Sequence, residues 1–130
     1  MSKFITSLLI DQITDEIFEL ASPLIYQSDI LGGLKVEVPA GFQSDGASVP
    51  RLPIVYALYG NRAHHEAVLH DFFYRIDSVP EVSFKIANKL FLEAMEVRGK
   101  PFYIRWPMYF GVVAGGWTAY HKKLVGDKLT

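Results

Sequence analysis

The sequence predicts an α+β domain in which N-terminal antiparallel strands and hairpins pack on three C-terminal helices. Short β-type runs fill the chain before Pro39, whereas helical periodicity dominates after Asn61. The chain has 130 residues, of which 50% are hydrophobic and 21% charged, so it can form one domain with its own core. We therefore expect a single domain over residues 1–130, β-rich over about 1–60 and helical over about 61–125.

Four short runs rich in Ile, Leu, Phe, Val and Thr predict strands over residues 4–10, 16–20, 24–27 and 34–38. Gly32 and Gly33 predict the turn of a hairpin between the last two runs. Strict alternation over 34–38 predicts that one face of this strand lies in the core and the other in solvent. Pro39 ends the strand because it cannot donate a ladder hydrogen bond. Residues 40–53 combine Gly, Pro and small polar residues with apolar ones at both ends, which predicts an ordered loop.

Three helices are predicted next, over about residues 62–76, 80–99 and 104–124. Asn61 is the expected N-cap of the first helix. The second helix is expected to begin near Pro80, after Asp77 or Ser78, and to stop at Gly99. Helical spacing places one set of apolar residues on a single face of the second helix: Ala87, Leu90, Phe91, Ala94 and Met95.

Composition excludes several classes of function. Lys and Arg total 13 against 14 Asp and Glu, and this balance argues against a nucleic-acid partner. The absence of cysteine excludes disulfides, zinc–thiolate sites, iron–sulfur clusters and thiol nucleophiles. The longest apolar stretch, residues 106–120, is shorter than the ~20 residues of a membrane span, and the apolar N-terminal run ends at Asp11, too early for a signal peptide.

The polar residues that suggest a catalytic or metal-binding site lie on the first predicted helix. One face of this helix is formed by residues at positions i, i+3, i+4 and i+7, namely Ala67, His70, Asp71 and Tyr74. The rest of the helix is apolar, which predicts that it is buried with His70 and Asp71 in or beside the core. A buried carboxylate needs a partner, and the candidates for Asp71 are Arg51, Arg75 or a cation.

Two interpretations of these residues are open. In the first, Asp71 and Asp45, with loop carbonyl oxygens, offer the ligands that calcium prefers, and His70 takes a proton from water. In the second, Asp71 is hydrogen-bonded to loop amides or paired with Arg51, His70 is a core histidine, and Asp45 with Gly46 forms an ordinary turn.

Two further clusters have simpler explanations. The stretch His64, His65 and Glu66 lacks the i, i+4 histidine spacing of a zinc helix once His70 is included, so we expect a solvated helix surface. The aromatic residues of the third helix are expected in the core, with docking on a partner or a lipid interface as the alternative: Phe102, Tyr103, Trp106, Tyr109, Phe110 and Trp117.

The chain resembles a bacteriophage and prophage family catalogued as domain of unknown function 1353. The resemblance covers about residues 16–120 and implies a phage origin and a location in the host cytoplasm or the virion. It is carried by motifs in the expected order, namely Val38-Pro39-Ala40-Gly41-Phe42, Ser44-Asp45-Gly46-Ala47-Ser48-Val49-Pro50-Arg51, Ala67-Val68-Leu69-His70-Asp71 with Tyr74, and Ala87-Asn88-Lys89-Leu90-Phe91-Leu92-Glu93-Ala94-Met95.

The same core is similar to bacterial phospholipase A2, which has an Asp-Gly-Cys-Ser loop followed by a helix with Cys, two residues and His-Asp. Asp45-Gly46-Ala47-Ser48 matches the calcium loop, and Ala47 and Ala67 stand where those enzymes have cysteines. The similarity implies that His70 is the general base and that Asp71 binds calcium. The later aspartate that orients the histidine falls at Asn88, whose amide cannot stabilise an imidazolium as a carboxylate does.

These resemblances imply two functions. One is a non-enzymatic virion, tail-assembly or accessory protein that binds a phage protein or itself through the aromatic third helix. The other is a calcium-dependent ester hydrolase in which His70 and Asn88 are catalytic and Tyr74 and Ser48 contact the substrate. For either function we expect segment 44–51 against the first helix, with Asp45 or Ser48 near Asp71.

The similarity to phospholipase A2 implies that the second helix runs antiparallel to the first and brings Asn88 to the imidazole of His70. An inward Asn88 follows from its shared helix face with Phe84, Phe91 and Met95.

Overall fold

The strands of the computed structural model form two antiparallel sheets. The structure describes residues 2–13, 17–44, 65–115, 120 and 123–128, and these contain six strands. One sheet has the order β1-β4-β5 and the other the order β2-β3-β6. The strands are β1 (Lys3–Phe4), β2 (Ile10–Gln12), β3 (Phe18–Leu20), β4 (Leu24–Ser28), β5 (Leu34–Val38) and β6 (Gln43–Ser44).

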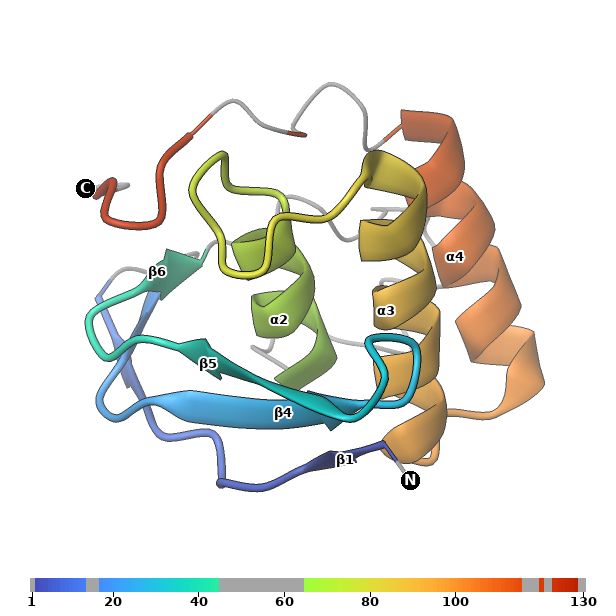
Figure 1. Cartoon of the computed structure of the whole chain (residues 1–130), viewed down its shortest axis with the longest axis horizontal. Helices are drawn as coiled ribbons and strands as arrows, with labels where there is room; N and C mark the ends of the chain where they lie inside the picture. Colours follow the sequence, from blue (N-terminus) through green and yellow to red (C-terminus); the bar gives the residue numbers. More distant parts are fainter. Residues whose placement is uncertain (1, 14–16, 45–64, 116–119, 121–122, 129–130) are drawn as a thin grey trace.

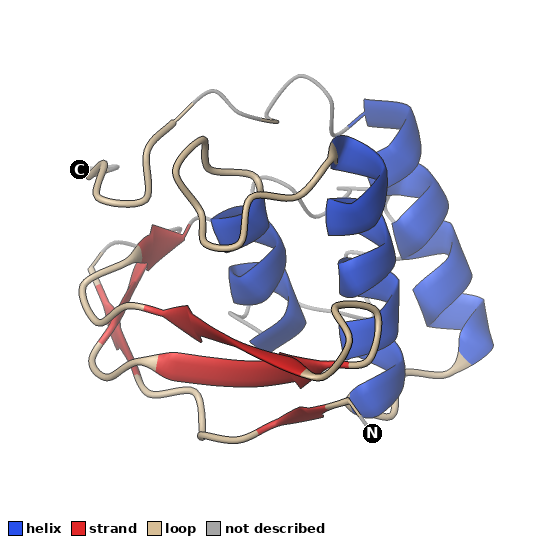
Figure 2. Cartoon of the chain, in the orientation of Figure 1, coloured by secondary structure: helices blue, strands red, loops and turns tan. Residues whose placement is uncertain are grey.

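The β4–β5 hairpin follows the prediction. Its register pairs Tyr26 with Val36, and Gly32 and Gly33 adopt φ values of 70° and 88° in the turn. This left-handed conformation is accessible to glycine because it has no Cβ. Val36 and Val38 are buried while Lys35 and Glu37 are exposed, as the alternation predicts, but Leu34 beside the turn is 48% exposed and does not join the core face. Figure 2 shows the hairpin along the lower side of the molecule.

Two strand predictions are corrected by the pairing. The run predicted as one strand over 4–10 is divided, because β1 pairs with β4 whereas Ile10 at the start of β2 pairs with Leu20 of β3. The chain therefore changes sheets within this run. In the segment predicted as a loop, residues 43–44 form β6, which pairs with β3 opposite Phe18 and Glu19.

The helices are α2 (His65–Phe73), α3 (Phe84–Val97) and α4 (Phe102–Gly115). These three helices with the preceding strands confirm the α+β class. Contacts of α3 with both α2 and α4 give the layered arrangement in Figure 1, in which α4 lies at the outer edge. Within the described part of the chain, no helix is long and apolar enough to cross a membrane.

Helix boundaries differ from the prediction at several ends. α2 ends at Phe73 because the next turn tightens, with Arg75 N donating to Phe72 O at 3.0 Å. α3 begins at Phe84, not near Pro80, since Ser83 is its N-cap and its side chain accepts a hydrogen bond from the backbone of the third following residue. Its predicted end is confirmed, and Gly99 has a φ of 78°.

The third helix begins two residues earlier than predicted and is shorter. Ile104 N and Arg105 N donate to the carbonyl of Pro101, which closes its first turn. Lys123 and Leu124 are not helical, so the predicted end at residue 124 is wrong. The predicted N-cap of the first helix, Asn61, lies outside the described residues.

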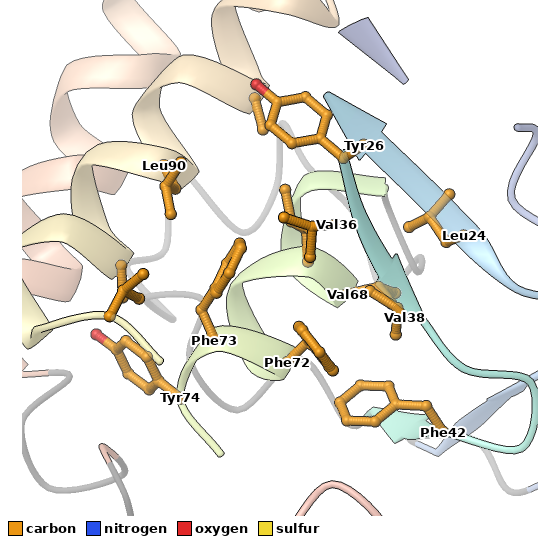
Figure 3. Close-up of a cluster of buried hydrophobic side chains, with 14 of the residues drawn as sticks. Leu24, Tyr26, Val36, Val38, Phe42, Val68, Phe72, Phe73, Tyr74 and Leu90 are labelled. Carbon is orange, nitrogen blue, oxygen red and sulfur yellow. The ribbon is translucent and has the colours of Figure 1, made fainter. Parts of the chain in front are cut away.

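The main core lies where α2 meets the β4–β5 hairpin. Figure 3 shows Leu24, Tyr26, Val36 and Val38 of the hairpin with Val68, Phe72, Phe73 and Tyr74 from α2 and its following turn, Phe42 before β6 and Leu90 of α3. A second buried cluster joins α3 to α4 and consists of Phe91, Met95, Met108 and Val112. The predicted apolar face of α3 is confirmed, because every member of it is buried.

Candidate functional site

Helix α2 is buried almost along its whole length, as its composition predicts. Every residue from Glu66 to Phe73 is buried, including the polar side chains of His70 and Asp71. Buried polar groups cost free energy unless they are hydrogen-bonded. The partners of His70 and Asp71 therefore define what this region can do.

The imidazole of His70 is bonded to α3. Its Nε2 lies 2.9 Å from Oδ1 of Asn88, and Asn88 is itself fully buried. Glu66, one turn earlier on α2, pairs with Arg98 and Lys100 beyond the end of α3, so the two helices run antiparallel. The structure thus brings together His70 and Asn88 in the geometry that the sequence predicts.

A third group converges on the same amide oxygen. The hydroxyl of Tyr74 donates to Asn88 Oδ1 at 2.6 Å, and burial raises the pKa of Tyr74, so this hydroxyl stays protonated at neutral pH. An amide oxygen only accepts hydrogen bonds. His70 therefore carries its proton on Nε2, and its Nδ1 has an unprotonated lone pair.

The surroundings of His70 favour the neutral ring. Its ring centroid lies 4.1 Å from that of Tyr74 and 4.6 Å from that of Phe91, and the residue is 1% exposed. Desolvation by burial lowers the pKa of His70 from 6.5 to about 4, although the hydrogen bond with Asn88 raises it in part. At neutral pH the imidazole is uncharged.

Two buried atoms of this network have no hydrogen-bond partner among the described residues. They are Nδ1 of His70 and Nδ2 of Asn88. The first is an acceptor and the second a donor, since the orientation of both groups is fixed by the bond between Nε2 and Oδ1. A neutral imidazole with an unpaired Nδ1 has the form that a general base requires.

Asp71 is hydrogen-bonded to β6. Its Oδ2 accepts a hydrogen bond from the hydroxyl of Ser44. Ser44 is the first residue of the segment 44–51 that was expected against this helix, so the start of that segment lies where predicted. Asp45 and Ser48, the residues expected nearest Asp71, lie outside the described part of the chain, as does Arg51.

Arg75, the other predicted partner of Asp71, makes its hydrogen bonds to backbone carbonyl groups. Its guanidinium donates to the carbonyl oxygens of Gln43 and Leu124, each at 3.1 Å, and lies 4.9 Å from the ring centroid of Phe42. It connects β6 with the C-terminal segment. Among the described residues no three His, Cys, Asp or Glu side chains form a group that could hold a metal ion.

The prediction for His65 and Glu66 is wrong. Glu66 is 0% exposed, and its carboxylate lies 3.6 Å from Nε of Arg98 and 3.8 Å from Nζ of Lys100. His65 Nε2 accepts a hydrogen bond from Leu8 N at 3.2 Å. The spacing of Glu66 from buried residues three, four and seven positions later could have identified its burial. His64 lies outside the described residues.

Sequence reasoning also missed Glu93. This residue of α3 accepts hydrogen bonds from Tyr26 Oη at 2.6 Å, Ser28 Oγ at 2.8 Å and Ile30 N at 3.2 Å. It therefore fastens α3 to the end of the β4–β5 hairpin. Because its partners are 63 to 67 residues away, no local pattern indicates this role.

Comparisons with known proteins give one match. The family model described as "Protein of unknown function (DUF1353)" matches residues 18–112, which is well over half of the chain and includes α2 and α3. No curated protein and no solved structure matches the chain.

Proposed function

Because the chain belongs to the DUF1353 family of proteins of unknown function, we propose its role from the site geometry: a non-enzymatic, phage-encoded virion, tail-assembly or accessory protein. The observation that carries the proposal is the burial of His70 against an amide. In this role His70, Tyr74 and Asn88 form a neutral polar network that fixes α2 against α3. The phage-family resemblance of the motifs supports a location in the host cytoplasm or the virion.

Three properties of His70 argue against catalysis. A general base must come within hydrogen-bond reach of the proton it removes, but His70 is 1% exposed and covered by the rings of Tyr74 and Phe91. Its pKa of about 4 makes it a weak base at neutral pH. Its partner Asn88 has no charge with which to stabilise the imidazolium that proton transfer would form.

The test compares the wild-type chain with Asn88→Asp and His70→Ala on a phospholipid and on a simple ester. The proposal predicts no hydrolysis by any of them and a lower free energy of unfolding for His70→Ala. For hydrolysis His65→Ala is the control, because His65 is the other described histidine of α2 and lies outside the network; it is not compared in unfolding, since it accepts a hydrogen bond from Leu8 N. Hydrolysis by the wild-type chain that His70→Ala removes would overturn the proposal.

A calcium-dependent ester hydrolase is the second candidate, and the unpaired Nδ1 of His70 supports it. In this function His70 Nδ1 removes a proton from water while Asn88 orients the ring through Nε2. Tyr74 and Ser48 would contact the substrate. Asp71 and Asp45 would hold calcium, and the charge of a bound calcium ion would polarise the ester carbonyl. The carboxylate of Asp71 beside the hydroxyl of Ser44 is an oxygen donor set of the kind that calcium prefers.

Calcium binding separates this candidate from the first. A ligand present at a hundred times its dissociation constant stabilises the folded state by about 2.7 kcal/mol, which a thermal melt detects. The hydrolase predicts a rise in melting temperature with calcium that Asp71→Asn removes. No shift at millimolar calcium, with magnesium as the control cation, would leave only the non-enzymatic function.

A further inference from the structure

The outer face of α4 exposes an aromatic stripe. We use this name for Phe102, Tyr103, Trp106 and Phe110, which are 68%, 61%, 42% and 61% exposed. Val113 continues the stripe at the C-terminal end of the helix. The opposite face of α4 is occupied, because Met108 and Val112 are buried against α3.

The composition of this face is typical of a protein interface. Interface cores are enriched in Trp, Tyr, Phe and Arg and depleted in Lys, Asp and Glu. Helix α4 has one charged residue, Arg105, and its guanidinium already donates to the carbonyl of Lys100 at 2.8 Å. The solvent-facing side of a surface helix ordinarily carries charged and polar residues, and the exposed face of α4 does not.

The nearby cations argue against an anionic membrane as the occupant. Arg98 and Lys100 lie beside the start of α4, but both are paired with the buried carboxylate of Glu66. Interfacial helices gain much of their affinity from Lys and Arg along the polar edge of the helix. The edge of α4 offers only Arg105.

The exposed positions of α4 are symmetric about residue 108. If a second α4 runs antiparallel across a two-fold axis there, Trp106 of each copy lies level with Phe110 of the other. Tyr103 lies level with Val113 in the same way. Each pair sets exposed residues against exposed residues, so the same patch on both copies is self-complementary.

The remaining pairs follow the same register. Phe102 lies level with Ala114, which is also exposed, and Arg105 lies level with Gly111, which has no side chain to oppose it. Large residues thus meet small ones at both ends of the helix. The charge of Arg105 does not meet its own copy.

The exposed area is sufficient for a modest dimer. At roughly 200 Å² for each aromatic side chain, the four rings of the stripe expose about 450 Å². Two such faces with their rims bury about 1,000 Å², the lower bound for a specific interface. We propose that α4 is the contact surface of a homodimer, in which two copies of this chain pack their aromatic stripes antiparallel. This inference does not depend on the chemistry of His70.

Sedimentation velocity at rising protein concentration tests the dimer. The expected result is a shift of the apparent mass from one chain to two. Trp106→Ser with Phe110→Ser should raise the dissociation constant at least about tenfold, since both rings lie at the centre of the contact. Val79→Ser is the matched control, because Val79 is 75% exposed and lies outside α4. The Val79→Ser variant should dimerise with the same dissociation constant as the wild type.

Cross-linking tests the orientation, because the chain contains no cysteine. Tyr103→Cys combined with Val113→Cys should form covalent dimers under mild oxidation. Either single variant should not, since its two thiols lie ten residues apart along the axis, or about 15 Å. Efficient dimers from either single variant would overturn the antiparallel arrangement.

Two results would overturn the homodimer itself. One is a monomer at every concentration, and the other is a dimer that the Trp106→Ser and Phe110→Ser changes leave intact. If the chain stays monomeric but sediments with phosphatidylglycerol vesicles, the stripe is a lipid-binding surface and the proposal is wrong.

Discussion

Acidification from pH 7 to pH 5 should destabilise the fold through His70. Burial lowers its pKa in the folded state to about 4, against an ordinary value of 6.5 that applies to the unfolded chain. At pH values between these two pKa values, His70 is protonated more often in the unfolded state than in the folded state. The stability that the neutral ring contributes is therefore complete above about pH 6.5 and is lost as the pH falls through this window.

The size of the effect follows from the two pKa values. Proton linkage for one group with these values gives a loss of about 2 kcal/mol between pH 7 and pH 5. The limiting loss, below the folded-state pKa of His70, is about 3 kcal/mol. Because the free energy of unfolding of a domain is about 5–15 kcal/mol, a loss of this size is readily measured.

Urea unfolding at the two pH values measures the loss, and His70→Gln supplies the reference. The glutamine side chain can still donate to Asn88 but does not titrate. Subtracting the pH dependence of His70→Gln removes the contributions of the carboxylates and of the other histidines, and a difference of about 2 kcal/mol should remain. Equal pH dependence in the two proteins would refute the burial of a neutral His70.

Three further predictions concern contacts made by α3. Glu93→Gln should cost about 1–3 kcal/mol of unfolding free energy in urea, because an amide N–H₂ then faces some of the three donors that the carboxylate satisfies; unchanged stability would contradict this. Ser83→Ala should cost about 1 kcal/mol through loss of the N-cap, whereas the exposed Ser7→Ala should be neutral. Asn88→Asp should raise the pKa of His70, measured by NMR titration, since a carboxylate stabilises the imidazolium; an unchanged pKa would show that residue 88 does not face the ring.

The parts of the fold that the sequence predicted depend on local patterns. The burial of Val36 and Val38 and the glycines of the turn are set by neighbouring residues, and both are found in the structure, although Leu34 at the start of the same alternation is exposed. The apolar face of α3 follows from helical spacing in the same way. These features need no knowledge of the rest of the chain.

The features that were missed depend on distant residues. β6 is a strand because Gln43 and Ser44 pair with β3, which lies more than twenty residues earlier. The ion-pair partners of Glu66, Arg98 and Lys100, follow α3 and lie more than thirty residues later in the chain. Neither pairing has a signature in the residues immediately around it.

Some contacts of the candidate site were predicted from the sequence and others were not. The contact of His70 with Asn88 was predicted from the resemblance to phospholipase A2, and helix spacing added only that Asn88 points inward. For Asp71 the approach of segment 44–51 was predictable, but the choice of Ser44 as donor depends on β6. The second bond to Asn88, from Tyr74, depends on how the chain turns after α2.

Residue 88 decides which chemistry the core can support. The oxygen of Asn88 accepts from two neutral donors, His70 and Tyr74, so the network contains no net charge. An amide is far less costly to bury than a carboxylate, which would require a charged imidazole or a cation beside it. With asparagine the stable state is a neutral core whose unprotonated Nδ1 is enclosed. With aspartate the same geometry would favour a protonated His70, so this single position links the stability of the fold to its capacity for proton transfer.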